Sequence, residues 1–402
     1  MSLESISVAF PNGAQFDRLL TGIERQNLIL TELVTNSATA ASAATLHEIS
    51  EIVRAGEAQH AFSVGDQINL NYNDGTNDYV LPFDVVHFGN VTLQDSEVVP
   101  GMYIQSHYAL QGIQFDGNEA FAIGPLAAGT YHFMIGVNWG TNCVANTSYE
   151  FVLANAVPEG GKLVLGTASS TIGALPDTAP ANWRVRSYAN GYTMDATEVV
   201  TLAVGNSGTD LGTLTSTTAY GTSGLNNIQR AAYGYNRWGQ SGMRQFLNSS
   251  AAAGSWWSEQ NPYDRAPDQL PTTRGFMAGF DEAFLNIIKP VKVRTSLNTV
   301  TDTAIGEYED TYDTFFLPSL EQEYIVPQVN GVEGEYWEYW KQRLGLSSPQ
   351  QREAAGANAN HIRYGYNAKT TTQYCRLRSA TRHYASNAWH VYTTGAAANG
   401  HA

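Results

Sequence analysis

Residues 361–402 read HIRYGYNAKTTTQYCRLRSATRHYASNAWHVYTTGAAANGHA and form the most informative stretch of the chain. They contain no Asp or Glu and are dense in Tyr, Asn, Ser, Thr, His, Ala and Gly. Antibody paratopes use the same residue types, because Tyr gives a large rigid contact area and Ser, Asn and Gly give adaptable hydrogen bonds. The basic residues of the segment favour an acidic ligand or glycan, or ion pairs with acidic loops elsewhere in the chain. They are Arg363, Lys369, Arg376, Arg378 and Arg382. The same composition also fits a terminal hairpin that only completes a sheet.

Upstream of this segment, from about residue 183, the sequence is irregular and aromatic. Short helices are expected around residues 241–248, 281–288 and 335–344, where capping residues and apolar steps coincide. The large aromatic residues are expected mainly in the core, because each buries a large apolar area, and ligand stacking is the alternative. They are Trp238, Trp256, Trp257, Phe315, Phe316, Trp337 and Trp340.

Near the end of the chain, Leu377-Arg378-Ser379 is followed by a polar stretch, Ala388-Trp389-His390-Val391 and Thr394-Gly395. Earlier blocks are Asn226–Arg230, Tyr233–Trp238, Met243–Asn248 and Phe315–Ser319. Together these blocks resemble the C-type-lectin-like domain of phage and bacterial proteins, which includes the variable proteins of diversity-generating retroelements. Two features depart from the family pattern. Arg376 stands where a Trp is usual, and the usual Arg-Pro-like ending is missing, so that either the final strand is absent or the terminus is truncated.

The resemblance implies a fixed scaffold that presents variable, ligand-facing side chains. In diversified members, mutated adenines turn Asn codons into codons for Tyr, Ser, Thr, His or Asp. The implied ligand-facing residues are Tyr364, Tyr366, Asn367, Tyr374, Arg376, Thr381, His383, Tyr384, Ser386, Asn387, His390, Tyr392 and Thr393. The implied scaffold residues are Trp238, Arg244, Arg378, Ser379, Trp389 and Gly395. Trp389 supports this division, because changing adenines alone cannot convert an Asn codon into a Trp codon.

The N-terminal half has two different periodicities. Apolar residues recur at helical steps over residues 14–55, ending with Leu46, Ile49, Ile52 and Val53. Such a helix pair either packs on the next domain or self-associates, and we favour self-association. From about residue 61, alternating segments separated by turns predict a β-sandwich or jelly-roll module. The first are an alternating stretch at residues 68–72, a turn-rich stretch at residues 73–78, and strand segments at residues 79–81 and 85–88.

We therefore expect an α+β, multidomain chain. Residues 1–60 form a helical oligomerisation or anchor segment, and residues 61–155 a β-sandwich-like module. Residues 156–182 form a Gly/Pro-rich linker, and residues 183–402 a C-type-lectin-like ligand-binding domain.

The overall charge limits the partners. The chain of 402 residues has 22 Lys and Arg against 37 Asp and Glu, a formal net charge of −15. A chain this acidic is repelled by nucleic acid and by anionic membranes. No apolar run approaches the ~20 residues of a membrane span, and the first residues do not read as a signal peptide. We expect synthesis in a host cytoplasm and a final location in a virion.

Catalytic and metal motifs are not evident. The nine His show no metal-ligand spacing, and Cys143 and Cys375 are too far apart in sequence to form a recognisable framework. Gly239-Gln240-Ser241-Gly242-Met243 lacks the final Gly of a nucleophile elbow. Acidic clusters at residues 307–310 and 333–338 would serve glycan cleavage or calcium binding, but a solvated acidic loop explains them better. We expect no enzymatic activity and no cofactor or metal.

The sequence as a whole predicts a phage receptor-binding or adhesion protein whose diversified C-terminal surface meets a bacterial surface glycan or protein. Other virion proteins and further copies of the chain, with a trimer favoured, are the expected partners. The alternatives are a virion structural or decoration protein without receptor binding and a glycan-degrading tail enzyme.

Overall fold

The computed structural model describes residues 39–110, 112–117, 234–261, 264–353 and 358–401, together with the backbone of short strands between residues 121 and 215. It is a mixed α+β structure with several small antiparallel sheets and few helices. The chain divides into two compact units. The first comprises residues 1–92, 97–107 and 280–288, and the second comprises residues 93–96, 108–279 and 289–402.

The first unit is built on the three-stranded antiparallel sheet β1 (Gln67–Asn73), β2 (Asp78–Thr92) and β3 (Val98–Ser106). The expected turn at residues 73–78 joins β1 to β2, with Asn73 paired to Asp78. Two predicted strand segments, 79–81 and 85–88, are parts of the single strand β2. Ile68, Leu70 and Leu81 are buried, as the alternation of apolar residues predicted.

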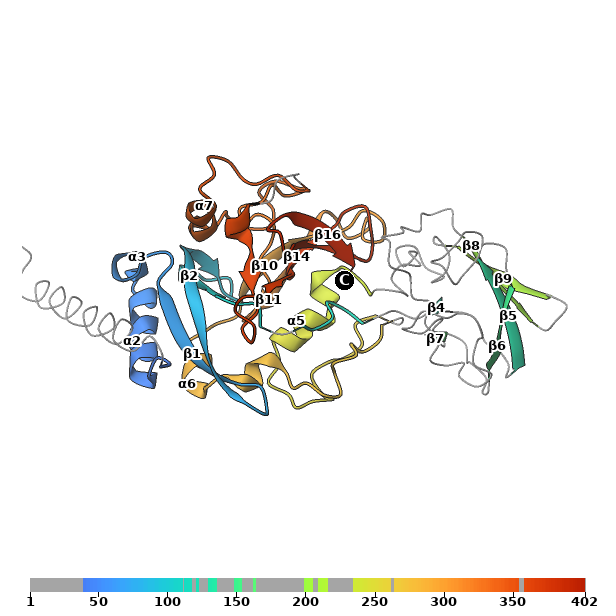
Figure 1. Ribbon diagram of the computed structural model, residues 1–402, viewed down its shortest axis with the longest axis horizontal. Helices are drawn as coiled ribbons and strands as arrows, with labels where there is room; N and C mark the ends of the chain where they lie inside the picture. The colour runs from blue at the N-terminus through green and yellow to red at the C-terminus, as the bar shows by residue number, and fades with distance from the viewer. Residues whose placement is uncertain are drawn as a thin grey trace, which may run out of the picture. The chain divides into compact units, whose positions relative to one another are not determined.

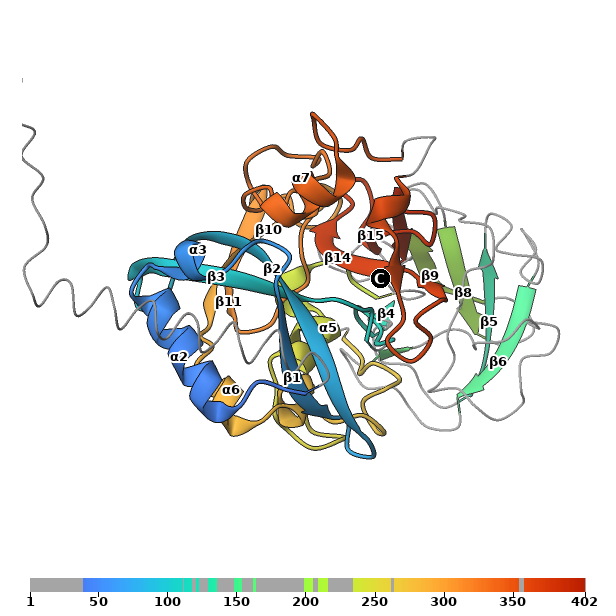
Figure 2. The same ribbon diagram turned by 60° about the vertical axis from the view of Figure 1, so that its left-hand side comes forward.

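Ser42 is the N-cap of helix α2 (Ala43–Arg54), and its hydroxyl accepts a hydrogen bond from the Thr45 amide at 3.2 Å. The short helices α3 (Ala58–Ala61) and α6 (Glu282–Leu285) belong to the same unit. Leu46 and Ile49 are buried where α2 packs against β3 and α6 (Figures 1 and 2). Packing within the unit thus covers Leu46 and Ile49, whereas Ile52 and Val53 are half-buried, and self-association of the helical segment stays a prediction. The helix expected over residues 14–38 lies outside the described residues.

The second unit contains a four-stranded antiparallel sheet in the order β6 (Ser148–Leu153), β5 (Gly129–Ile135), β8 (Val199–Val204) and β9 (Thr209–Thr215). A further pair joins β4 (Phe121–Ala122) to β7 (Lys162–Leu163). The strands expected in one module over residues 61–155 are thus divided between the sheets of two units. Alternation identifies a strand, but it does not identify the partner with which the strand pairs.

The rest of the second unit is built from short elements separated by long loops. Its helical turns are η1 (Trp238–Gln240), α5 (Gly242–Leu247), η2 (Phe276–Gly279), α7 (Glu338–Leu344) and η3 (Ala359–His361). Its remaining strands are β10 (Val291–Ser296), β11 (Tyr308–Asp313), β12 (Arg363–Tyr364), β13 (Thr372–Gln373), β14 (Cys375–Ala380), β15 (Asn387–Val391) and β16 (Ala397–His401). Helices α5, α6 and α7 fall within the three helices predicted in this region, each shorter than expected.

A strand follows Gly395, where the departure from the family pattern left a final strand in doubt. Strand β16 pairs with β15 along residues 397–401 and completes the sheet β14-β15-β16. The Ala- and Gly-rich ending carries little strand signal of its own, so that its pairing with β15 decides its conformation.

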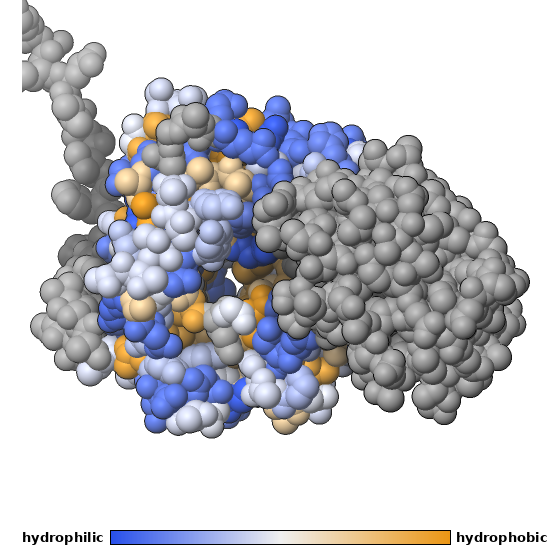
Figure 3. All heavy atoms as spheres, turned by 45° about the vertical axis from the view of Figure 1, so that its right-hand side comes forward, coloured by the Kyte–Doolittle hydropathy of each residue, from blue (hydrophilic) through white to orange (hydrophobic). Residues whose placement is uncertain are grey.

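None of the helices in the described part of the chain has the length and apolar character that a bilayer crossing requires. On the face shown in Figure 3, the described residues are mostly hydrophilic, and apolar residues lie in small groups between them.

Candidate ligand-binding surface

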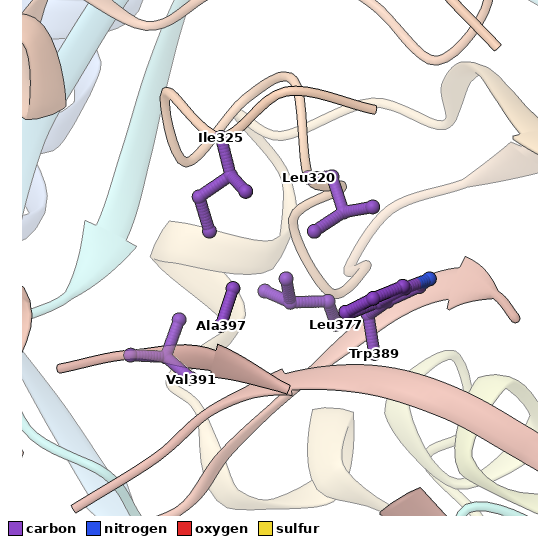
Figure 4. Close-up of a cluster of buried hydrophobic side chains, with 6 residues drawn as sticks. All are labelled: Leu320, Ile325, Leu377, Trp389, Val391 and Ala397. Atoms are coloured by element: carbon purple, nitrogen blue, oxygen red, sulfur yellow. The ribbon is translucent and has the colours of Figure 1, made fainter. Parts of the chain in front are cut away.

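The C-terminal sheet has two faces of different character. Leu377, Trp389, Val391 and Ala397 point from the strands towards Leu320 and Ile325 of the preceding loop and form a buried apolar cluster (Figure 4). Successive side chains of a strand point to opposite faces, so the residues between these positions lie on the other side. That second face carries Tyr374, Arg376, His390 and Tyr392, which we call the tyrosine–histidine face.

The rings of this face contact one another. The ring centroids of Tyr374 and Tyr392 are 4.7 Å apart in an edge-to-face arrangement. The His390 ring lies 5.7 Å from Tyr374 and 4.9 Å from Tyr392. Tyr374 is 58% exposed and Tyr392 36%, whereas His390 is only 6% exposed. Two exposed aromatic rings therefore contact each other and a buried imidazole.

Neither ring nitrogen of His390 has a hydrogen-bond partner among the described residues. Burial, with a smaller contribution from the nearby Arg376 charge, lowers the pKa of His390 from 6.5 to about 3. The imidazole is therefore neutral near pH 7 and offers one donor and one acceptor. Gly400 of β16 makes room for it, because a Cβ at that position would lie 2.5 Å from the His390 Cε1 atom.

Arg376 pairs with His390 across β14 and β15, and its Nη1 donates to the Gly400 carbonyl at 3.1 Å and more weakly to the Ala388 carbonyl at 3.4 Å. Among the described residues no carboxylate pairs with this guanidinium, and its Nε and Nη2 have no hydrogen-bond acceptor. Burial lowers the pKa of Arg376 to about 10, which leaves it charged at neutral pH. The tyrosine–histidine face thus has a fixed positive charge beside a neutral imidazole.

The loop between β14 and β15, residues 381–386, is held by residues outside it. The Asn236 side-chain amide donates to the Tyr384 carbonyl at 2.8 Å and to the Asn387 carbonyl at 2.7 Å. The Asn236 backbone amide donates to the Ala385 carbonyl at 2.9 Å. Asn298 fixes the orientation of Asn236 by donating to its Oδ1 at 2.9 Å. The backbone of the loop therefore does not depend on most of the loop's own side chains.

A second set of bonds holds the other side of the same loop. Thr299 donates to the Arg382 carbonyl through its amide and its hydroxyl, both at 2.7 Å. The Gln328 Oε1 atom accepts from the Arg382 amide at 2.9 Å and from the Trp389 indole at 3.2 Å. At the tip, His383 is exposed and Tyr384 is half-buried.

The implied scaffold residues lie in the interior or bind groups there. Trp238 is fully buried and donates to Asp313 at 2.9 Å, and Arg244 binds the same carboxylate at 2.6 Å. Ser379 is buried and donates to Glu333 at 2.6 Å, and the Trp389 side chain lies in the cluster of Figure 4.

Arg378 is a buried cation that organises several loops. It donates to the Leu317 carbonyl at 2.7 Å, to Gln322 at 2.5 Å and to the Glu333 carbonyl at 2.6 Å. It also reaches Thr295 and the Arg294 carbonyl of β10. Gly395, the last scaffold position, has φ +82°, and a Cβ there would lie 2.1 Å from the Asn358 carbonyl oxygen.

The implied ligand-facing residues divide into three groups. The exposed ones are Tyr364, Asn367, Tyr374, His383 and Tyr392. The partly exposed ones are Tyr366, Arg376, Tyr384 and Thr393. The buried ones are Thr381, Ser386, Asn387 and His390.

Burial corrects the outward orientation that was implied for this last group. Thr381 and Ser386 lie at the two ends of the held loop, and the Asn387 carbonyl accepts a hydrogen bond from the Asn236 side-chain amide. These three residues help to shape the loop, and they are too buried to contact a large ligand. His390 is distinct, because its ring nitrogens lack a described partner and its ring contacts the exposed rings of Tyr374 and Tyr392.

A second aromatic group lies around Lys369. The Lys369 ammonium lies 5.3 Å from the Tyr108 ring centroid and 5.5 Å from that of Tyr366. The Ala109 amide donates to the Tyr364 carbonyl at 2.8 Å, which joins the two segments. Tyr364, Tyr366 and Asn367 are thus brought together, apart in sequence from the loop at residues 381–386.

The residues that hold the C-terminal surface from outside were not predicted from the sequence. Asn236 lies in one of the blocks quoted for the resemblance, but its role had no signal beyond that position. Asn298, Gln328 and Glu333 stand in segments with no recognisable motif, and Tyr108 is more than 250 residues from Lys369 in sequence. Only tertiary contacts join these residues to the C-terminal segment.

The acidic clusters have structural partners. Glu309 accepts from Arg237 at 2.8 Å, and Asp310 pairs with Arg294 at 2.7 Å and Lys292 at 2.8 Å. The Arg294 guanidinium lowers the pKa of Asp310. Glu333 is buried and accepts hydrogen bonds from Ser296 and Ser379. These carboxylates are engaged in holding the fold.

The described residues include no cluster of three or more His, Cys, Asp or Glu side chains arranged to hold a metal ion. Burial raises the pKa of the Cys375 thiol to about 11, which keeps it protonated at neutral pH. A protonated buried thiol is a poor nucleophile.

Comparison with known proteins gives one match. Residues 212–402 are similar to a family described as a domain of unknown function, DUF6273. No curated protein and no solved structure matches the chain, and the comparisons identify no lectin fold. The matched region contains the tyrosine–histidine face and the residues that hold the loop at 381–386.

Proposed function

We propose that this chain is a receptor-binding or adhesion protein of a phage particle, which presents its C-terminal surface to a ligand on a bacterial cell. In this proposal residues 183–402 form a C-type-lectin-like domain, as the similarity of the Leu377–Gly395 region to that family implies. The chain acts by binding, without catalysis, and assembles as a homo-oligomer, with a trimer favoured, beside other virion proteins. Several copies would raise the effective affinity of a weak contact.

One observation carries the proposal: the loop at residues 381–386 is held by side chains outside it. Asn236 and Thr299 bind backbone carbonyls of the loop, and such bonds do not depend on the identity of its side chains. A loop fixed in this way tolerates change at His383 and Tyr384 without losing its shape. This is the property that a diversified recognition surface needs.

The composition of the exposed residues supports the same conclusion. Tyr364, Tyr374 and Tyr392 are exposed large aromatic residues on the C-terminal segment. Tyr side chains lose little conformational entropy on binding and are enriched at the centres of interfaces. Their clustering on a segment without acidic residues favours recognition over a purely structural role.

Cell binding by the full-length protein tests the proposal. The labelled protein is titrated onto a panel of bacterial strains, and the bound fraction is measured by flow cytometry. We expect at least one strain to bind, and the double variant His383→Ala/Tyr384→Ala to bind that strain at least about tenfold more weakly, a loss of ~1.4 kcal/mol typical of hot-spot contacts. Unfolding in urea should shift by less than about 1 kcal/mol, because the loop backbone is held from outside.

Tyr336→Ala provides the matched control, because Tyr336 is 37% exposed and lies outside the C-terminal segment. It should leave cell binding within about twofold of the unchanged protein. Equal binding by the loop variant and the unchanged protein would count against the proposed surface. Binding to no strain would favour the virion structural role instead.

A further inference from the structure

Three groups of polar and aromatic side chains could hold a ligand by their chemistry. They are the buried pair His361 and Glu323, the aromatic group around Lys369, and the tyrosine–histidine face. His361 and Glu323 are 3.0 Å apart and both almost fully buried, so that they have no room for a ligand. Lys369 is already engaged by the rings of Tyr108 and Tyr366. The tyrosine–histidine face combines exposed rings with unused hydrogen-bonding groups.

We propose that the tyrosine–histidine face binds a carboxylate-bearing sugar, with the carboxylate at Arg376, a hydroxyl at His390 and the sugar ring against Tyr374 and Tyr392. This inference rests on the proposed function and names the ligand class of that same surface. It makes acidic glycans the targets of the chain, in preference to neutral glycans and acidic peptides.

The charge of the face determines the carboxylate part of the ligand. Arg376 keeps its positive charge, and no described carboxylate neutralises it. One edge of its guanidinium is fixed by the Gly400 carbonyl at 3.1 Å, while Nε and Nη2 find no acceptor among the described residues. A planar guanidinium with free donors matches a carboxylate. The segment 361–402, which has no Asp or Glu, does not compete for it.

The imidazole determines the hydroxyl part. His390 is 6% exposed, and both its ring nitrogens lack a partner, an arrangement that costs free energy until a ligand supplies one. A neutral imidazole has one donor and one acceptor, and a hydroxyl group can meet either. Sugars carry many hydroxyls, whereas the side chain of an acidic peptide offers only acceptors.

The two tyrosines determine the ring part. Tyr374 and Tyr392 present exposed rings 4.7 Å apart at their centroids, and both rings contact the imidazole. Their rings offer apolar area next to the polar groups, and the apolar C–H face of a sugar can cover that area. A polyanionic nucleic acid fits less well, because the chain as a whole carries a formal charge of −15.

Calorimetric titration of the full-length protein tests the inference with defined probes. The probes are short oligosaccharides of galacturonate, glucuronate and N-acetylneuraminate, each measured beside its own methyl ester, together with hexaglutamate. We expect at least one acidic sugar to bind and its methyl ester to bind at least about tenfold more weakly, since the ester removes the charge that meets Arg376. Hexaglutamate should bind at least about tenfold more weakly than that sugar.

Variants locate the binding. Arg376→Gln should weaken the acidic sugar at least about tenfold and leave the methyl ester unchanged, and Arg376→Lys should retain part of the preference for the acid. Lys369→Gln removes an exposed cation of the same segment and should change binding less than about twofold. Thermal unfolding of each variant shows whether it is folded. If Arg376→Gln is not folded, the comparison rests on Arg376→Lys.

The inference is overturned if no acidic sugar binds, or if the acid and its methyl ester bind equally. It is also overturned if hexaglutamate binds as tightly as the best sugar, or if Lys369→Gln weakens binding of the acidic sugar as much as Arg376→Gln does. The proposed function is separate from these outcomes. Cell binding that is lost with His383→Ala/Tyr384→Ala but keeps its strength with Arg376→Gln would keep the receptor-binding role and discard the acidic sugar.

Discussion

His390 should make the stability of the second unit depend on pH in a way that one substitution removes. Its pKa in the folded protein is about 3, whereas an unfolded chain gives a histidine about 6.5. A base with a lowered folded pKa stabilises the fold fully above the unfolded value, and this contribution is lost as the pH falls below about 6.5. Between about pH 7 and pH 5 the unfolded chain takes up nearly one proton that the folded protein does not bind. The resulting loss is about 2 kcal/mol.

The residues that surround the imidazole explain why its pKa is lower in the folded protein. Arg376 lies opposite it on β14, and the rings of Tyr374 and Tyr392 contact it. No described carboxylate faces the imidazole to stabilise its protonated form. His390→Phe keeps a ring in the space that Gly400 leaves open and removes the titrating group. It also removes two buried nitrogens that lack partners, so its stability near neutral pH should be unchanged or higher.

Urea unfolding near pH 7 and near pH 5, followed by tryptophan fluorescence, measures the effect. All eight Trp residues belong to the second unit, so the signal reports on that unit. The unchanged protein should lose about 2 kcal/mol more stability than His390→Phe over this interval. His383→Gln, at an exposed histidine, should behave like the unchanged protein. Identical pH dependence in His390→Phe and the unchanged protein would refute the buried, neutral imidazole.

Two further predictions concern the framework. Arg378→Met should destabilise the second unit by about 3–5 kcal/mol in urea unfolding, because it removes the buried guanidinium that donates to the Leu317 and Glu333 carbonyls and to Gln322; a loss below about 1 kcal/mol would show that water replaces the guanidinium. Gly395→Ala and Gly331→Ala both place a side chain at positive φ, but only Gly395 has a backbone atom, the Asn358 oxygen, 2.1 Å from the new Cβ. Gly331→Ala should therefore cost about 1–2 kcal/mol and Gly395→Ala clearly more, and equal losses in thermal unfolding would contradict the close packing at Gly395.

Local pattern determined many of the elements. Alternation from residue 68 predicted β1, and the turn-rich residues 73–78 correctly joined it to the next strand. Helices were predicted at α5 and α7, although α5 was set one residue too long at each end and α7 three residues too early at its start. These signals are local, because each depends on side chains within one element and on the face that the element buries.

Local pattern did not determine which elements pack together. The strands between residues 61 and 155 looked like one module, yet β1–β3 form a sheet of their own and β5 pairs with β8, which begins at Val199. Leu46 and Ile49 belong to a stripe that fitted either self-association or packing on the next domain. In the structure, helix α2 packs against β3 and α6 and buries these two residues. Register and partner choice depend on contacts between distant segments, and one sequence does not display those contacts.

For the candidate site, the sequence by itself determined the chemical character of the C-terminal segment: rich in Tyr and His, basic, and free of acids. Only the tertiary structure decided which of those side chains face outward. It buried Thr381, Ser386 and Asn387 and placed His390 against two exposed tyrosines. The physical reason is that the loop takes its shape from Asn236 and Thr299, which lie far away in sequence and bind its backbone. Backbone hydrogen bonds from distant residues leave no periodicity in the loop's own sequence.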